Sequence, residues 1–165
     1  MGDKISLAKP KIIKFEWDFP LDFVVVIDTR EQDQLFKRPT KGLVIVRNKL
    51  EAGDYSVRGF ESSISIERKH LSDLHQSLGR ERERFKRELE RLKLYECKWL
   101  VIEANEDECL SFQHFGGMHP NAIRQSLASI ECRYGIAVHY QPDRRKLERW
   151  VLDRLLRFYR IKRGD

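Results

Sequence analysis

Acidic and basic side chains lie at the ends of several apolar runs in this sequence. Asp54 follows a glycine, and Glu67 and Lys69 end the apolar run SISIERK. Alternate residues of a strand point to the same face, so Glu67 and Lys69 are expected to share a face while Arg68 points away from it. A neighbouring hairpin strand that starts at Asp54 would place a second carboxylate beside Glu67.

These residue types suggest a particular chemistry. Two carboxylates that lie close together repel each other, and one of them becomes neutral unless a cation sits between them. Oxygen ligands select Mg²⁺ or Mn²⁺, and such an ion polarises a phosphoryl oxygen and activates a water. The Lys69 ammonium would orient that water and stabilise charge that develops on the phosphate. The set is suited to phosphodiester hydrolysis, although an acid and a base that alternate along a strand also form ordinary salt bridges.

Short apolar runs rich in β-branched residues predict the strands that position these groups. The runs are FVVVID, LVIVR, SISIE, WLVIE and IAVHY, at residues 23–28, 43–47, 63–67, 99–103 and 136–140. Alternation after Gly53 predicts one more strand within 51–59. The strands up to residue 67 are expected to pair antiparallel, and those that alternate with helices after it are expected to pair parallel.

Helical periodicity appears in three segments. Apolar residues recur at helical steps across 71–92, where Gly79 predicts a helix that is either bent or divided. Further helices are predicted at 120–134 and 147–158, with a loop at 104–119. This order of strands and helices predicts an α/β fold with a mixed central β-sheet flanked by helices.

Length and composition limit the class of protein. The chain has 165 residues, 41% hydrophobic and 35% charged, which is typical of one globular domain with a charged surface. Its net charge of +6 is compatible with a polyanionic partner without requiring one. No apolar run approaches the roughly twenty residues that cross a bilayer, and the N-terminus lacks the apolar segment of a signal peptide. The expected location is the cytoplasm for a prokaryotic or viral source and the nucleus for a eukaryotic one.

The spacing of the charged residues resembles a known nuclease motif, GD…ERKxxxD of the XPF-type structure-specific endonuclease family. The matching residues are Gly53 and Asp54, then Glu67, Arg68 and Lys69, then Asp73. Upstream, Asp28-Thr29-Arg30-Glu31 is similar to that family's D-x-R-E strand end. The arginine-bearing segment SLGRERERFKRELERL resembles the helix that follows the motif, so the resemblance covers roughly residues 22–160.

The resemblance implies a restriction-endonuclease-like fold and cleavage of DNA at junctions between duplex and single strands, in repair or recombination. It implies Mg²⁺ or Mn²⁺ held by Asp54, Glu67 and the carbonyl of Arg68, with Asp28 as a further candidate ligand. The family positions needed for cleavage are matched by Asp28, Arg30, Asp54, Glu67, Lys69 and Asp73. Residues 22–165 would form the nuclease domain, preceded at 1–21 by an N-terminal arm or edge strand.

The sequence departs from the family's usual pattern in two respects, because we expect neither the paired helix-hairpin-helix module that usually binds duplex DNA and forms dimers nor a helicase-like region. Substrate preference and subunit arrangement therefore stay open. A homodimer through the C-terminal half, or a partner subunit, is a further prediction, and light scattering on the purified protein would test it.

Several of these residues have ordinary structural alternatives. Asp28 and Asp54 could be turn-formers, and Arg30 could simply pair with Glu31 or Asp28. Asp73 could stabilise the start of a helix, and the arginines and glutamates of 80–91 could pair with one another on a solvated face. The alternatives at the level of function are a catalytically silent DNA-binding or scaffold subunit and a sequence-specific nuclease on the same fold.

Overall fold

The structure is a computed structural model that describes residues 17–111 and 117–165. Six strands form one sheet in the order β2-β1-β3-β4-β5-β6. The strands are β1 (Val24–Asp28), β2 (Val44–Asn48), β3 (Tyr55–Val57), β4 (Ile64–Lys69), β5 (Cys97–Ile102) and β6 (Ala137–Tyr140). The helices are α1 (Leu71–Leu78), α2 (Arg82–Leu92), α3 (Glu106–Ser111), α4 (Pro120–Tyr134) and α5 (Arg144–Arg163). The predicted α/β fold with a mixed sheet is confirmed.

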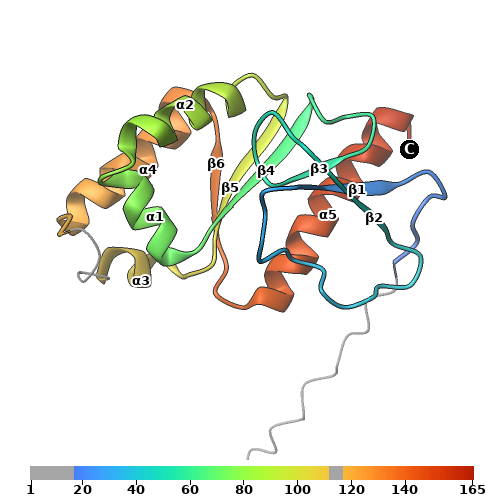
Figure 1. Cartoon of the computed structure of the whole chain (residues 1–165), viewed down its shortest axis with the longest axis horizontal. Coiled ribbons are helices and arrows are strands. Elements are labelled where there is room, and N and C mark those ends of the chain that lie inside the picture. Colours follow the sequence, from blue (N-terminus) through green and yellow to red (C-terminus); the bar gives the residue numbers. More distant parts are fainter. Residues whose placement is uncertain (1–16, 112–116) are drawn as a thin grey trace, which may run out of the picture.

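Helices cover both faces of the sheet because successive side chains of a strand point to opposite sides. In β5, Val101 belongs to the core that contains Leu155 of α5, while Leu100 and Ile102 belong to the core formed by α1, α2 and α4. Figure 1 shows the same division, with α5 on one side of the sheet and α1, α2 and α4 on the other. No helix within the described ranges is long and apolar enough to cross a membrane.

The pairing of the first strands differs in part from the prediction. β3 is antiparallel to both β1 and β4, as expected. The expectation that β1 and β2 also pair antiparallel is wrong, since Val24 to Asp28 run parallel to Val44 to Asn48. The connection at 29–43 is long enough to carry the chain back to the same end of the sheet, which a hairpin turn cannot do. Arg47 of β2 donates to the carbonyl of Glu31 at 2.6 Å and ties this connection to the strand.

The helices settle one open prediction and correct another. The periodic segment at 71–92 is divided, because α1 ends at Leu78 and α2 begins at Arg82. The predicted loop at 104–119 contains α3, whose start is held by a reciprocal capping pair. Glu108 N–H donates to Asn105 Oδ1 at 2.7 Å, and Asn105 N–H donates to Glu108 Oε2 at 2.8 Å. This is the capping-box pattern, which the sequence carries as N-x-x-E.

The predicted N-terminal arm is described only in part, since residues 1–16 lie outside the described ranges. Residues 17–20 are not in a strand. The ring of Trp17 stacks on Phe19 with centroids 5.6 Å apart, and Phe19 stacks on Phe23 at 5.7 Å. This part of the chain therefore packs against the core beside β1.

Candidate functional site

A polar cleft brings together the side chains predicted to do chemistry. It consists of two adjoining hollows that share Arg30, Asp54, Glu67, Lys69 and Arg84. Asp28 lines the inner hollow, and Asp73 lines the outer one. All six predicted side chains therefore line this cleft, which lies between the sheet and α2.

Asp54 is fixed by hydrogen bonds to the strands on both sides of it. Its backbone N–H donates to the carbonyl of Ile66 at 2.9 Å, and its carbonyl accepts from the N–H of Asp28 at 2.8 Å. Its side-chain Oδ2 accepts from the backbone N–H of Arg68 at 2.7 Å. The carboxylate is thus held against β4, directly beside the ERK tripeptide.

Gly53 makes this placement of Asp54 sterically feasible. Its φ of +77° lies in the left-handed region, and a Cβ there would meet Ser65 Oγ at 2.0 Å. Ser65 is fully buried, and its hydroxyl donates to the carbonyl of Ala52 at 2.8 Å, so it cannot move aside cheaply. A side chain at position 53 would therefore separate the Asp54 turn from β4.

We expect Gly53→Ala to destabilise the protein by about 3 kcal/mol or more, because backbone strain and overpacking add. Gly59→Ala is the matched control, since Gly59 also has a positive φ, +82°, but nothing lies within 4 Å of its would-be Cβ. Strain alone should cost the control about 1 kcal/mol. Urea denaturation in chelator gives both free energies of unfolding, and equal losses would contradict this account of Gly53.

Glu67 and Lys69 share a face of β4, as the period of a strand requires. Lys69 Nζ lies 2.6 Å from Glu67 Oε1 and 3.9 Å from Glu88 Oε2 of α2. The same ammonium lies 5.2 Å from the centroid of the Phe85 ring. Lys69 is therefore held between the sheet and α2, with its amine inside the cleft.

The cleft carries more negative than positive charge at its centre. Burial, and then the charge of Glu67, raise the pKa of the Asp54 carboxyl well above its ordinary range. Burial also raises the pKa of Glu67, although the Lys69 ammonium opposes the shift. Burial alone would lower the pKa of Lys69, but the attraction of Glu67 and of the nearby acids raises it. Across the described ranges Asp54 has no ion-pair partner, whereas the Lys69 ammonium lies within 4 Å of both Glu67 and Glu88.

Asp28 and Arg30 form a separate, charge-balanced pair at the edge of the cleft. Asp28 accepts from the N–H, Nε and Nη2 of Arg30 at 2.8, 2.7 and 3.1 Å, and from the N–H of Leu50 at 2.7 Å. Burial opposes ionisation of Asp28, but these hydrogen bonds outweigh it and lower the pKa of its carboxyl. Arg30 also donates to the Leu50 carbonyl at 2.9 Å. The pair thus connects the end of β1 to the chain that leads into the Asp54 turn.

Arg68 points to the opposite face from Glu67 and Lys69, as predicted, and its side chain is only 2% exposed. Its guanidinium donates to Glu103 Oε1 at 2.9 Å, to the Asp33 carbonyl at 2.9 Å and to Glu31 Oε2 at 3.2 Å. Arg144, at the start of α5, donates to Asp33 Oδ2 at 2.7 Å and so extends the network to the helix that covers this face of the sheet. Neither Asp33 nor Arg144 was predicted in this role, because neither belongs to a motif or to a periodic face in the sequence.

Asp73 and the charged face of α2 line the cleft and also have the ordinary structural roles considered above. Asp73 is exposed in the first turn of α1, where an acid interacts favourably with the helix dipole. The residues of α2 that line the inner hollow are Arg84, Glu88 and Arg91. Their spacing of four and three places them on one face of the helix, a signal that the sequence carried. The charged face of α2 is therefore partly self-paired, through Arg84 and Glu81 at 3.1 Å, and partly a wall of the cleft.

The donor set of the cleft fits Mg²⁺ or Mn²⁺. No three His, Cys, Asp or Glu side chains in the described part of the chain are arranged to hold a metal, so a cage made wholly of side chains is not formed. Mg²⁺, however, commonly binds one or two carboxylates and keeps water or phosphate oxygens as its other ligands. Asp54 and Glu67 provide two carboxylates. The N–H and C=O of one strand residue point to the same side, so the Arg68 carbonyl faces the side where Asp54 accepts the Arg68 N–H.

The chain is similar to a known protein family and to solved structures. The sequence profile of the family described as "ERCC4 domain" matches residues 27–153. The fold is similar to that of XPF from Aeropyrum pernix in complex with DNA, with 23% identity and a TM-score of 0.62 over 87% of this chain and 68% of that one. It is also similar to XPF from Aeropyrum pernix, with 24% identity and a TM-score of 0.61 over 82% of this chain and 64% of that one. No curated protein matches the chain.

Proposed function

Because the chain belongs to the ERCC4 domain family, we propose that it is a metal-dependent endonuclease that hydrolyses phosphodiester bonds of branched or flap DNA. The family match confirms the XPF-type resemblance of the motif, and the XPF structures confirm the restriction-endonuclease-like fold. One of those relatives is in complex with DNA, which supports DNA as the substrate. The observation that carries the proposal is the cleft that brings together the carboxylates of Asp54 and Glu67 and the ammonium of Lys69, which is paired with Glu67.

Asp54, Glu67 and the Arg68 carbonyl would hold Mg²⁺ or Mn²⁺. When bound, such an ion supplies positive charge to a phosphodiester oxygen and makes a coordinated water more acidic. Asp28 is left out of this proposed ligand set, because both of its oxygens accept hydrogen bonds from Arg30 and Leu50. We assign Asp28 to positioning instead, since it holds Arg30 at the rim of the cleft.

The cationic side chains of the cleft would act on the phosphate. Lys69 is held by Glu67 with its amine inside the cleft, where it would orient the attacking water and stabilise charge that develops on the phosphate. Arg30 keeps 62% of its side chain exposed while Asp28 fixes its guanidinium, so it is placed to contact a neighbouring phosphate. Asp73 faces the outer hollow, where the DNA would enter.

The purified chain should be incubated with labelled flap, splayed-arm and plain duplex DNA, each with Mg²⁺, with Mn²⁺ and with chelator. We expect cuts near the junction of the branched substrates in either metal and none in chelator. Binding of branched DNA without cuts in either metal would instead identify a silent DNA-binding subunit. Cutting in chelator would contradict metal dependence.

Arg144 lies outside the cleft and supports Arg68 through Asp33, which allows a test of the contacts behind the cleft. Arg144→Gln removes the hydrogen bonds from α5 to Asp33 Oδ2 and to the Gln34 carbonyl, both at 2.7 Å. We expect a loss of about 1–2 kcal/mol in the free energy of unfolding, and a roughly tenfold rise in the Mg²⁺ concentration needed for half-maximal cleavage, because the support of Arg68 is loosened. Arg145→Gln is the control, because Arg145 is exposed and, among the described residues, donates only through its backbone. An unchanged Mg²⁺ requirement would show that the network does not support the metal site.

A further inference from the structure

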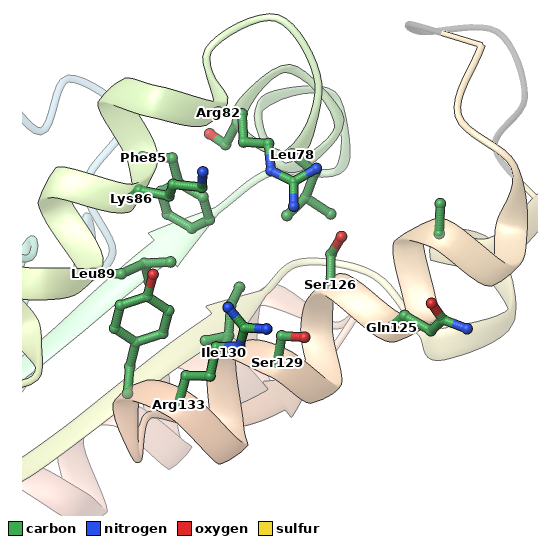
Figure 2. Close-up of a pocket in the computed structure, with 13 residues that line it drawn as sticks. Leu78, Arg82, Phe85, Lys86, Leu89, Gln125, Ser126, Ser129, Ile130 and Arg133 are labelled. Atoms are coloured by element: carbon green, nitrogen blue, oxygen red, sulfur yellow. The ribbon is translucent and has the colours of Figure 1, made fainter.

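A second hollow lies on the other side of α2 from the cleft. We call it the α2–α4 groove, because α2 with the end of α1 forms one wall and α4 forms the other. Figure 2 shows Arg82 and Lys86 extending from α2, and Arg133, Ser126 and Ser129 extending from α4. No aspartate or glutamate is among the described residues that line it. The groove therefore combines cations with neutral hydrogen-bond donors.

The cations of the groove are available to a ligand. Within residues 17–111 and 117–165, neither Arg82 nor Arg133 makes an ion pair or a side-chain hydrogen bond, and both are exposed. Lys86 lies 2.8 Å from Glu83, but the two side chains are 46% and 75% exposed. Pairs this exposed contribute little stability and exchange readily. An anion in the groove would thus meet little competition from the protein itself.

The walls of the groove are rigid. Its floor is formed by Leu78, Phe85, Leu89 and Ile130, which are buried in the core shared by α1, α2 and α4. The cations are therefore presented on two helices whose spacing is set by core packing. Such a fixed array is suited to a ligand with negative charges at regular intervals.

The groove adjoins the cleft. Ser77, at the end of α1, lines both the groove and the outer hollow of the cleft. On α2, Phe85 lines the groove and also contacts the Lys69 ammonium that reaches into the cleft. Ser77 and Phe85 are both buried, so they form part of the wall between the two hollows, and a strand that occupies both would pass over this wall.

We propose that the α2–α4 groove binds phosphate groups of a DNA strand whose scissile bond lies in the cleft. The inference rests on the proposed function, since it takes the substrate of the cleft as the occupant of the groove. Arginine guanidinium groups bind phosphate bidentately, and serine hydroxyls and the Gln125 amide donate to its remaining oxygens. The contacts go to phosphates, so the groove positions the strand without reading its sequence.

The test compares two double variants with equal loss of charge. Arg82→Gln with Arg133→Gln removes two cations from the groove, and Arg145→Gln with Arg157→Gln removes two exposed arginines from α5, on the other face of the sheet. The dissociation constant for labelled flap DNA is measured in chelator over a range of salt concentrations. Each lost phosphate contact lowers the slope of log K against log salt by about 0.9. We expect the groove variant to lose about two units of slope and to bind roughly tenfold more weakly at 0.1 M salt, and the control to lose less than half a unit.

Single-turnover cleavage with saturating protein separates this inference from the proposed function. If the wild type cuts DNA and the two double variants bind it equally well, the groove assignment is overturned and the function stands. If the wild type cuts nothing, but only the groove variant loses DNA binding, the groove assignment stands and the function falls. If the groove variant binds DNA like the control variant but has lost the binding of polyglutamate that the wild type shows, the groove is an acidic-peptide site and the assignment is overturned.

Discussion

Asp54→Asn should lower the single-turnover rate of DNA cleavage in Mg²⁺ by about a thousandfold or more. The substitution keeps a side-chain oxygen that can accept from the Arg68 N–H, so the turn and the fold should persist. It removes, however, one of the two anionic ligands proposed for the metal, and with it the charge that holds the ion against the phosphate. Affinity of the DNA in chelator should stay the same or increase, because one negative charge has left the cleft.

The same substitution should stabilise the metal-free protein at neutral pH. Burial and Glu67 raise the folded-state pKa of Asp54 above its ordinary value of 3.8. Stability from this group is therefore fully present below about pH 4 and is lost as pH rises through the raised pKa. Asparagine is neutral throughout, so the variant should exceed the wild type in thermal stability at neutral pH in chelator, and the difference should vanish in acid. Added Mg²⁺ should stabilise the wild type and leave the variant nearly unchanged.

Asp107→Asn is a suitable control for both measurements, because Asp107 is exposed on α3 and its side chain makes no hydrogen bond or ion pair with the described residues. The Asp107→Asn variant should have the cleavage rate and the thermal stability of the wild type. If Asp54→Asn cuts as fast as this control, or if Mg²⁺ stabilises it as strongly as the wild type, the metal site is not where we place it.

Lys69→Met should lower the cleavage rate by at least about a hundredfold while leaving metal affinity intact or stronger. The substitution removes a cation that lies 2.6 Å from Glu67, so the cleft becomes more negative and attracts a divalent ion more strongly. The water and the phosphate, however, lose the group proposed to orient them. This combination separates Lys69 from Asp54, for which rate and metal affinity should fall together.

In chelator, Lys69→Met should also destabilise the protein, by about 3 kcal/mol. Glu67 is only 7% exposed, and without Lys69 this buried carboxylate loses the cation that lies 2.6 Å from it. Mg²⁺ should restore most of this loss, because the ion takes the place of the ammonium as the partner of Glu67. Lys146→Met on α5 is the control, since Lys146 is exposed and only its backbone N–H is hydrogen-bonded to the part of the chain that the structure describes. A loss of metal affinity equal to that of Asp54→Asn would mean that Lys69 acts by holding Glu67 in place.

The local features of the site were predictable from the sequence because they depend on short-range geometry. The period of a strand places Glu67 and Lys69 together and Arg68 apart, and the contacts of all three agree with it. The pairing of Arg30 with Asp28 is likewise a contact between residues two positions apart. Such contacts need no knowledge of the tertiary fold.

The remaining features depend on contacts between distant parts of the chain. Arg68 meets Glu103 across 35 positions, and Arg144 meets Asp33 across 111. The parallel pairing of β1 with β2 follows from the path of the 29–43 connection, which leaves no periodic pattern in the sequence. Arg133 faces Arg82 only because α4 packs beside α2, so the α2–α4 groove could not be read from the charges of either helix alone.

The position of β4 in the sheet has a consequence for how this site tolerates insertions and deletions. β4 is hydrogen-bonded to β3 on one side and to β5 on the other, with Ile64 to Lys69 in register with Cys97 to Ile102. A slip by one residue would turn Arg68 into the cleft and send Glu67 and Lys69 to the far side of the sheet. The cleft would then lose Lys69 and one of the two carboxylates proposed to bind the metal, and it would gain the Arg68 guanidinium. A single-residue indel in β4 should therefore be more damaging than any point substitution within the ERK tripeptide, whereas a two-residue indel would preserve which side chains face the cleft.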